Sequence, residues 1–272
     1  MGAKIETADG GKPPLKISGS QLNGINYAMN IASGQVKSCM FLAGLYAKGQ
    51  TSVTEPAPCR DHTERMLKSF GAVIEIEDND EGRTIILEGY PELKSQSIIV
   101  PRDPSSAAFP VCAALIVEGS DISVPNIALN PTRSGLFKTL REMGGDIEYL
   151  KKGIEGGEPI ADLRVKFSKL KGIDIPAGRA ASMIDEYPIL SIVASFGEGK
   201  TVMRGVGELR VKESDRIDAM ARGLSACGIK TEQDEDTFVV HGKGSRGVLL
   251  SLIHISEPTR PERISYAVFC LK

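Results

Sequence analysis

The chain has 272 residues, which is long enough for one large domain or two medium-sized ones. Its 33 basic and 35 acidic residues give a net charge of −2, which argues against a general nucleic-acid-binding surface. The first residues form no apolar signal region, and no apolar run is long enough to span a bilayer. The five cysteines are scattered without a C-x-x-C spacing, which favours a reduced, cytoplasmic compartment and suggests neither a disulfide framework nor a zinc site.

In chain order, the predicted elements repeat with a period of about 70–80 residues. A small-residue turn leads into a strand at residues 2–6, 71–75 and 144–148, and a weaker copy lies at 228–231. Glycine suits the left-handed turn that ends a helix, and the β-branched residues that follow suit a strand. The repeat predicts that one structural unit recurs along the chain.

Two kinds of helix are predicted in each unit. Amphipathic helices precede the last three of these turns, and we expect them to be capped by Thr63, Ser134 and Ser214. Upstream of each lies a helix that is apolar on nearly every side, which predicts complete burial; these helices cover residues 36–45, 107–117 and 189–196. Each unit therefore contains helix, strand, helix, strand and strand, which indicates a mixed α/β (α+β) fold.

The repeat is incomplete at both ends. Residues 1–3 fall in the middle of a unit, so we expect that an N-terminal stretch is missing. The pattern stops near Gly244, and residues 249–260 resemble translated sequencing-adapter DNA. We therefore expect residues 245–272 to be an artefact, the alternative being a genuine divergent tail.

Two polar segments in the first 100 residues precede predicted helices, where backbone N–H groups favour anions. In residues 32–38, Ser33 and Gln35 offer side-chain hydrogen bonds, and small neighbours allow a ligand to approach the backbone. In residues 54–64, the planar guanidinium of Arg60 suits a carboxylate or phosphate. The structural alternatives are a simple helix cap and a surface ion pair.

Two further segments carry charged residues before helices. Asp185 adjoins a long apolar helix, and partial desolvation there turns a carboxylate into a useful base. Lys212 and Arg216 suit phosphate or carboxylate binding, and Glu213 suits proton transfer. The alternatives are complementation of a helix dipole and solvated ion pairs. No GxGxxG, P-loop, HExxH or GxSxG motif is present, which argues against nucleotide, zinc-protease and serine-hydrolase chemistry.

Taken together, these segments resemble 3-phosphoshikimate 1-carboxyvinyltransferases (EPSP synthases), and their residues are most similar to the glyphosate-tolerant class. The matching strings, in order, are SGQVKS at 33–38, RDHTE at 60–64, DPSSAAFP at 103–110, NPTR at 130–133, SMIDEYP at 182–188 and LRVKESDR at 209–216. The resemblance implies an enolpyruvyl-transferase fold with two lobes of repeated βαβαββ units, in which substrates bind in the cleft. Residues 1–100 would belong to the first lobe and 101–244 to the second.

The resemblance also implies a reaction. The enolpyruvyl group of phosphoenolpyruvate is transferred to the 5-hydroxyl of shikimate 3-phosphate, phosphate leaves, and no metal or organic cofactor is needed. By the family pattern, the expected ligands of shikimate 3-phosphate are Ser33, Gly34, Gln35, Arg60, Asp185 and Lys212. Gln35 and Arg216 are expected to bind phosphoenolpyruvate, and Asp185 and Glu213 are the expected catalytic carboxylates.

Three departures from the family pattern bear on activity. Gly34 stands where related enzymes more often have Ala or Ser. The family's Lys-Ser-Arg loop and first-lobe arginine are missing, and so are the C-terminal arginine and lysine that bind phosphoenolpyruvate. We therefore expect little or no turnover from this chain, which we expect to be a monomer.

The alternatives are a UDP-N-acetylglucosamine enolpyruvyl transferase, a non-catalytic module of the same fold, and an RNA 3′-phosphate cyclase-like protein. The Lys212–Arg216 region favours the shikimate enzyme over the UDP-sugar enzyme. The near-neutral charge and the lack of a nucleotidylation motif count against the cyclase-like protein.

Overall fold

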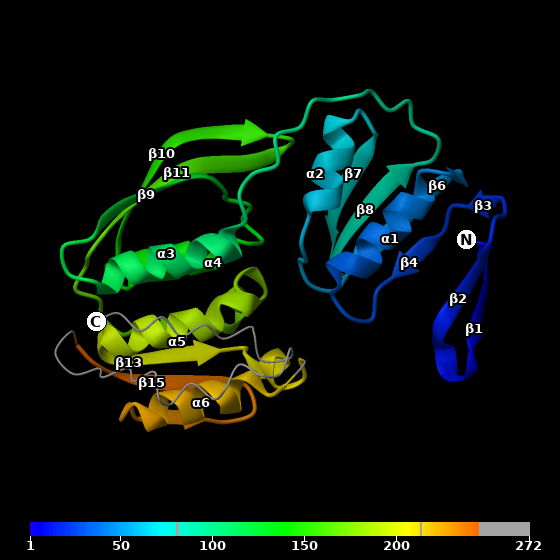
Figure 1. The fold of residues 1–272 in the computed structure, drawn as a ribbon. Helices are drawn as coiled ribbons and strands as arrows, with labels where there is room; N and C mark the ends of the chain where they lie inside the picture. Colours follow the sequence, from blue (N-terminus) through cyan, green and yellow to red (C-terminus); the bar gives the residue numbers. More distant parts are fainter. Residues whose placement is uncertain (80–81, 213, 245–272) are drawn as a thin grey trace. The chain divides into compact units, whose positions relative to one another are not determined.

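The computed structural model describes residues 1–79, 82–212 and 214–244. The contacts divide this part of the chain into two units. Unit 1 comprises residues 1–100 together with 155–158, and unit 2 comprises residues 101–154 and those from 159 onward (Figure 1). The lobe boundaries expected from the family stay a prediction, and the proposed tail at 245–272 lies outside the described residues.

Unit 1 contains a β-hairpin, a short parallel strand pair and a four-stranded sheet covered by two helices. Its elements are β1 (Lys4–Ala8), β2 (Lys12–Ser18), β3 (Leu22–Asn23), β4 (Asn26–Ala28), α1 (Gly34–Gly44), β5 (Ala47–Lys48), β6 (Gln50–Glu55), α2 (His62–Ser69), β7 (Ile74–Asn79) and β8 (Gly82–Glu88), with a 3-10 turn at Asp9–Gly11. The four-stranded sheet has the order β4-β6-β8-β7. Strands β4 and β6 are parallel, whereas β8 runs antiparallel to both of its neighbours.

The core of unit 1 is small. Phe41 of α1 and Leu67 of α2 pack with Ile85 and other apolar residues of the sheet. The prediction that residues 36–45 are buried on every side is wrong: the side chains of Val36 and Leu42 are 41% and 50% exposed. The reason is that, among the described residues of unit 1, α1 packs mainly against the strands β3, β5, β6 and β8.

The described residues of unit 2 form two sheets and four α-helices. Its elements are α3 (Pro104–Ile116), β9 (Asp121–Ala128), α4 (Gly135–Glu142), β10 (Asp146–Glu155), β11 (Glu158–Lys166), β12 (Asp174–Ile175), α5 (Tyr187–Phe196), β13 (Glu198–Arg204), α6 (Arg216–Ala226), β14 (Thr231–Gln233) and β15 (Thr237–Lys243). Short 3-10 helices lie at Ala177–Ser182, Ile184–Glu186 and Gly207–Arg210. The sheets have the orders β10-β11-β9 and β12-β13-β15-β14.

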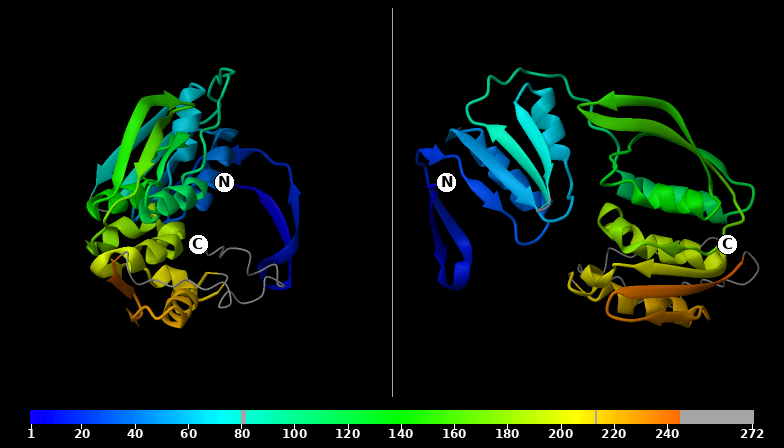
Figure 2. Two further views of the ribbon diagram at one scale, coloured as in Figure 1. Left: turned by 60° about the vertical axis from the view of Figure 1, so that its left-hand side comes forward. Right: turned by 180° about the vertical axis from the view of Figure 1, so that it is seen from behind.

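The apolar helices of unit 2 are buried as predicted. α3 packs against β9 and α5, and α5 packs in turn against β15 and α6. Figure 2 shows α3 and α5 stacked between the two sheets. One large cluster of buried apolar residues, which includes Leu115, Leu190 and Val240, joins these layers.

The predicted repeat is confirmed. The order and directions of β4-β6-β8-β7 recur in β12-β13-β15-β14, where the first pair is parallel and the others are antiparallel. In the third copy, a parallel bridge from Arg102 to Ile127 occupies the place of the short first strand. Gly71 and Gly144, at equivalent turns, have φ angles of 93° and 97°, a conformation that glycine adopts without strain. Each copy therefore has the predicted βαβαββ order.

Two of the predicted helix caps are wrong. α2 has Asp61 at its N-cap position, and the hydroxyl of Thr63 lies instead 2.7 Å from that of Ser38. α6 is capped by Asp215, whose carboxylate accepts a hydrogen bond from the backbone N–H of Asp218. Ser134 does occupy the N-cap position of α4, but its side chain makes no capping bond. In α6 the carboxylate of Asp215 makes the capping bond expected of its neighbour Ser214, whereas Asp61 at the N-cap position of α2 makes no side-chain capping bond.

Candidate functional site

The first predicted segment forms the start of α1. Ser33 caps this helix, and its hydroxyl accepts a hydrogen bond from the backbone N–H of Val36 at 3.3 Å. Gly34 and Gln35 are the first two residues of the helix, and the side chain of Gln35 is exposed. Helix capping by Ser33 is thus present, and the free N–H groups of the first turn offer an anion-binding position beside it.

Arg60 lies against this helix start. A Cβ atom added to Gly34 would be 3.4 Å from the Cβ of Arg60 and 3.6 Å from its carbonyl oxygen. Arg60 precedes α2 and is half-buried. Arg65, just beyond this segment, donates a 2.9 Å hydrogen bond to Asp61. The structure therefore brings the two predicted anion-binding segments of unit 1 together.

Directly beneath these segments lies a buried charged group that the sequence analysis missed, called here the Lys37 cluster and formed by Lys37, Glu55, Cys59 and Glu64. The Nζ atom of Lys37 lies 2.9 Å from Glu55 Oε2 and 2.5 Å from Glu64 Oε1. The three charged side chains are only 1%, 1% and 4% exposed. The thiol of Cys59 donates to the same Glu55 oxygen at 2.8 Å. The sequence signal that could have indicated this cluster was Lys37, the single charged residue in the first predicted apolar helix.

The two titratable hydrogen donors of the Lys37 cluster have shifted pKa values. Burial alone would lower the pKa of Lys37, but the hydrogen bonds to Glu64 and Glu55 outweigh it and raise that pKa above its ordinary value. Burial, reinforced by the hydrogen bond to Glu55, raises the pKa of Cys59 to about 11. Lys37 is therefore charged and Cys59 is a thiol at neutral pH.

In unit 2, Asp185 and Arg216 are neighbours. Asp185 lies in the 3-10 turn Ile184–Glu186, which leads into α5, and Arg216 is the first residue of α6. Arg216 Nη1 is 3.6 Å from Asp185 Oδ1. The side chain of Asp185 is 39% exposed within the described residues, and its expected partial desolvation stays a prediction. The turn directs Ile184 and Glu186 into the protein and Asp185 outward.

The buried neighbour Glu186 is bound to the start of α3. Its carboxylate accepts a short hydrogen bond from the hydroxyl of Ser105, and that hydroxyl accepts one from Arg133 at 2.6 Å. Arg133 also contacts Asp103 at 3.1 Å. Asp103 caps α3 by accepting hydrogen bonds from the backbone N–H groups of Ser105 and Ser106. Two of the sequence strings that matched the family, 103–110 and 130–133, thus support the turn that carries Asp185.

The predicted cationic segment before α6 forms local ion pairs. Lys212 pairs with Glu208, and Arg210 Nη1 lies 2.8 Å from Asp215. Burial raises the pKa of Asp215, but hydrogen bonds from Asp218 and Arg210 outweigh it and hold the pKa below its ordinary value. The ion-pair alternative is thus correct for Lys212 within the described residues, whereas Arg216 faces Asp185. The proposed proton carrier Glu213 lies outside the described residues.

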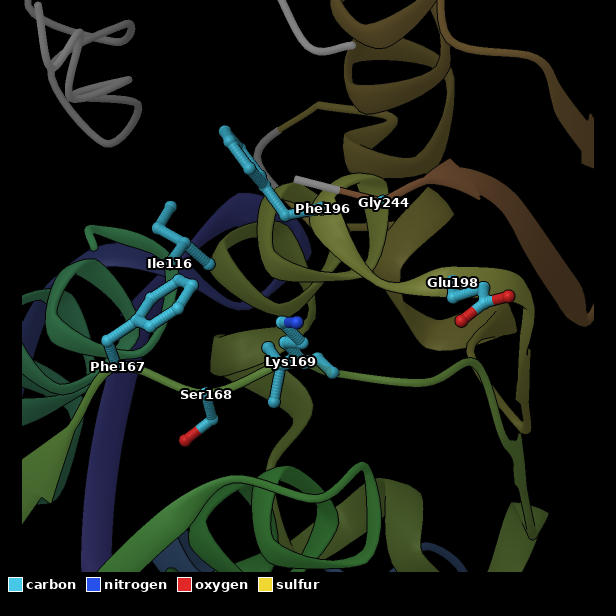
Figure 3. Close-up of a pocket in the computed structure, with 8 residues that line it drawn as sticks. Ile116, Phe167, Ser168, Lys169, Phe196, Glu198 and Gly244 are labelled. Atoms are coloured by element: carbon cyan, nitrogen blue, oxygen red, sulfur yellow. The ribbon is translucent and has the colours of Figure 1, made fainter. Parts of the chain in front are cut away.

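A small pocket occupies the other end of α5. It is lined by apolar side chains that include Ile116, Phe167 and Phe196, with Lys169 and Glu198 at its rim (Figure 3). The ten residues of α5 separate it from Asp185, which corresponds to about 15 Å along the helix axis. None of the predicted site residues lines this pocket.

Across the described ranges, no group of three or more His, Cys, Asp or Glu side chains is arranged to bind a metal ion. Within these same ranges, no helix has the length and apolarity needed to cross a membrane. Cys39, Cys59, Cys112 and Cys227 are all free thiols.

Comparisons with known proteins identify these features as those of one family. The family model for EPSP synthase (3-phosphoshikimate 1-carboxyvinyltransferase) matches residues 1–251. Proteins named 3-phosphoshikimate 1-carboxyvinyltransferase from Roseobacter denitrificans and Cereibacter sphaeroides are 61% and 59% identical over 250 and 245 residues. These alignments cover 91% and 90% of this chain but 56% and 55% of the relatives. The chain therefore spans about half the length of the curated relatives it matches.

Solved structures agree with the sequence matches. EPSP synthase from Acinetobacter baumannii superimposes with a TM-score of 0.83 at 49% identity, over 90% of this chain and 55% of that one. The enolpyruvyl transferase NikO from Streptomyces tendae, at 17% identity, has a TM-score of 0.65 over 89% of this chain and 56% of its own, which shows a shared fold. The predicted enolpyruvyl-transferase fold is confirmed.

Proposed function

Because this chain belongs to the EPSP synthase family, we propose that it supplies substrate-binding and proton-transfer residues for 3-phosphoshikimate 1-carboxyvinyl transfer. In that reaction the 5-hydroxyl group of shikimate 3-phosphate loses its proton and its oxygen forms a bond to C2 of phosphoenolpyruvate, while the methylene carbon gains a proton. A proton then leaves the methyl group, the C–O bond to phosphate breaks, and the products are the enolpyruvyl ether and inorganic phosphate. The names of the matched relatives favour this substrate over a UDP-sugar.

The observation that carries the proposal is the contact between Arg60 and the start of α1. This contact is made by the Cβ and backbone atoms of Arg60. An arginine carried on a segment that lies against the free N–H groups of a helix start suits an anionic ligand such as the phosphate or carboxylate of shikimate 3-phosphate. We assign Ser33, Gly34, Gln35 and Arg60 to this ligand. Gln35 is also assigned to phosphoenolpyruvate.

The corresponding assignments in unit 2 are Asp185 and Lys212 for shikimate 3-phosphate and Arg216 for phosphoenolpyruvate. The 3.6 Å contact between Arg216 and Asp185 supports a role for this pair in one site, because it places a cationic and an anionic side chain side by side. Asp185 and Glu213 are the proposed proton carriers. A bound anion would compete with Glu208 for Lys212.

Ligand binding tests the proposal directly. We expect shikimate 3-phosphate at millimolar concentration to raise the melting temperature of the 272-residue chain, and UDP-N-acetylglucosamine to leave it unchanged. Arg60→Met removes the guanidinium at similar side-chain length and should abolish the shift. The absence of any shift with shikimate 3-phosphate would contradict the proposal, and a shift with the UDP-sugar alone would favour the sister enzyme.

We also propose a cytoplasmic, monomeric protein, as the family resemblance implies. The free thiols among the described residues are compatible with a reducing compartment. Sedimentation velocity tests the oligomeric state: a single species of about the chain mass of 29.1 kDa is expected, and a concentration-dependent larger species would contradict it.

A further inference from the structure

The Lys37 cluster is the feature of this molecule that the proposed function does not use. Two carboxylates and one ammonium group lie together with almost no exposure. Each carboxylate has a further buried oxygen, Glu55 Oε1 and Glu64 Oε2, with no hydrogen-bond partner within the described ranges. Charges removed from water in this way contribute little to stability, because desolvation offsets their mutual attraction. An explanation other than stability is therefore needed.

The geometry of the cluster supplies that explanation. Lys37 lies in the first turn of α1, three residues beyond the helix start at Gly34. Glu64 lies in the first turn of α2, four residues beyond Arg60, and Glu55 ends strand β6. One ammonium group thus joins three chain segments at the points where two anion-binding segments leave the sheet and enter their helices.

A second link joins the same two helices. The hydroxyl oxygens of Ser38 and Thr63 lie 2.7 Å apart, and that of Ser38 also donates to the carbonyl oxygen of Gly34 at 2.7 Å. Both links hold the start of α1 against the start of α2. A Cβ atom added to Gly34 would make ordinary van der Waals contact with Arg60, which agrees with this arrangement.

We propose that the Lys37 cluster positions the two anion-binding segments of unit 1, residues 33–35 and Arg60, for one shikimate 3-phosphate molecule. Lys37, Glu55 and Glu64 are positioning residues, since they act through the helix starts and are buried away from any ligand. The inference rests on the proposed function for the identity of the ligand, but the alignment of the two segments is a property of the free protein.

Paired substitutions at Glu64 separate positioning from stability. Glu64→Gln and Glu64→Met both remove the excess negative charge and leave a neutral pair of Lys37 and Glu55. Only glutamine still accepts a hydrogen bond from Lys37 Nζ, whereas methionine has a similar volume without that acceptor. Glu6→Gln and Glu6→Met provide a matched control, because Glu6 forms an exposed pair with Lys16 in the β1–β2 hairpin.

Two measurements on the 272-residue chain follow. By calorimetry, Glu64→Gln should bind shikimate 3-phosphate within about threefold of the unsubstituted chain, and Glu64→Met should bind at least about tenfold more weakly. In the ligand-free chain, backbone hydrogen exchange in residues 33–38 and 58–63 should be faster in Glu64→Met than in Glu64→Gln. The Glu6 variants should change neither quantity.

The outcomes are distinct. Equal affinity and equal exchange in the two Glu64 variants would overturn the positioning role. If the unsubstituted chain does not bind shikimate 3-phosphate, the proposed function fails, and the exchange measurement still decides whether the cluster aligns the segments. If Glu64→Met does not fold, Thr63→Val removes the second link at nearly constant volume; faster exchange in residues 33–38 is then expected, and unchanged exchange would overturn the inference.

Discussion

The two units use the same repeat in different ways. In unit 2, the apolar helices α3 and α5 pack against each other between two sheets, and their side chains join one large core. Among the described residues of unit 1, the equivalent helix α1 packs mainly against strands, exposes Val36 and Leu42, and buries Lys37. A single repeat cannot cover its own apolar helix, so stacking of neighbouring repeats provides the burial. In unit 1, the helix α1 is instead joined to β6 and α2 by the ion pairs of Lys37 with Glu55 and Glu64.

The largest effect is expected from a substitution that removes the cation of the Lys37 cluster in unit 1. Lys37→Met leaves Glu55 and Glu64 buried without a cation, which should lower the free energy of unfolding by about 3–5 kcal/mol. Urea denaturation followed by circular dichroism measures this, which suits a chain without tryptophan. The exposed Lys16 serves as the control, since Lys16→Met should change the same quantity by less than about 0.5 kcal/mol. Equal effects would show that the burial of Lys37 has no energetic consequence.

The next prediction compares the apolar helices of the two units. Leu190→Ala in α5, where the side chain is 0% exposed, should lower the free energy of unfolding by about 2–5 kcal/mol. Leu42→Ala in α1, where the side chain is 50% exposed, should cost less than about 1 kcal/mol. Both values come from the same urea titration. A cost at Leu42 as large as that at Leu190 would mean that α1 is covered in solution.

A smaller effect is expected at the start of α6. Asp215→Ala removes the capping carboxylate and its ion pair with Arg210, at a cost of about 1 kcal/mol, whereas Ser214→Ala should have almost no effect. Because folding lowers the pKa of Asp215, its contribution is present above the ordinary aspartate pKa of 3.8. It is lost as the pH falls through the lowered value. The stability difference between Asp215→Ala and the unsubstituted chain should therefore shrink in acid, and a constant difference would exclude this linkage.

The smallest effect compares two helix-initiating glycines. An added Cβ at Gly34 would make ordinary contact with Arg60, so Gly34→Ala should stabilise the chain by about 0.5 kcal/mol with little change in ligand affinity. An added Cβ at Gly135, the first residue of α4, would lie 2.2 Å from Ser182 Oγ and 3.2 Å from two atoms of Met183. Gly135→Ala should therefore destabilise the chain. Thermal melting of both variants tests the sign, which should be opposite in the two units.

Much of the fold was predictable because the repeat follows from the local conformational preferences of the residues. Glycine turns such as Gly71 and Gly144, apolar periodicity and β-branched runs specify each helix and strand within a few residues. The cap at Ser214 was wrong because the neighbouring Asp215 accepts the capping hydrogen bond, and the cap at Thr63 was wrong because α2 has Asp61 at its N-cap position. Which of two adjacent polar side chains caps a helix depends on which one the backbone places next to the free N–H groups of the first turn.

For the candidate site, the order of six short strings was enough to identify the family and to propose the ligands. The sequence alone could not show that Asp185 faces outward while Glu186 turns inward to Ser105, since both are acidic residues in one short turn. It also could not show that Arg60 lies against Gly34, because 26 positions separate them along the chain and only the sheet beneath brings them together.

The sequence by itself determined the repeated βαβαββ units, the apolar helices and the family, because these depend on local preferences and on the order of motifs along the chain. Tertiary structure alone decided which apolar helix is covered and which charged groups meet. Lys37 finds Glu55 and Glu64 only once α1, β6 and α2 are packed. Coulombic and hydrogen-bonding partners are set by distance in space, and distance in space between remote segments is a property of the packed fold.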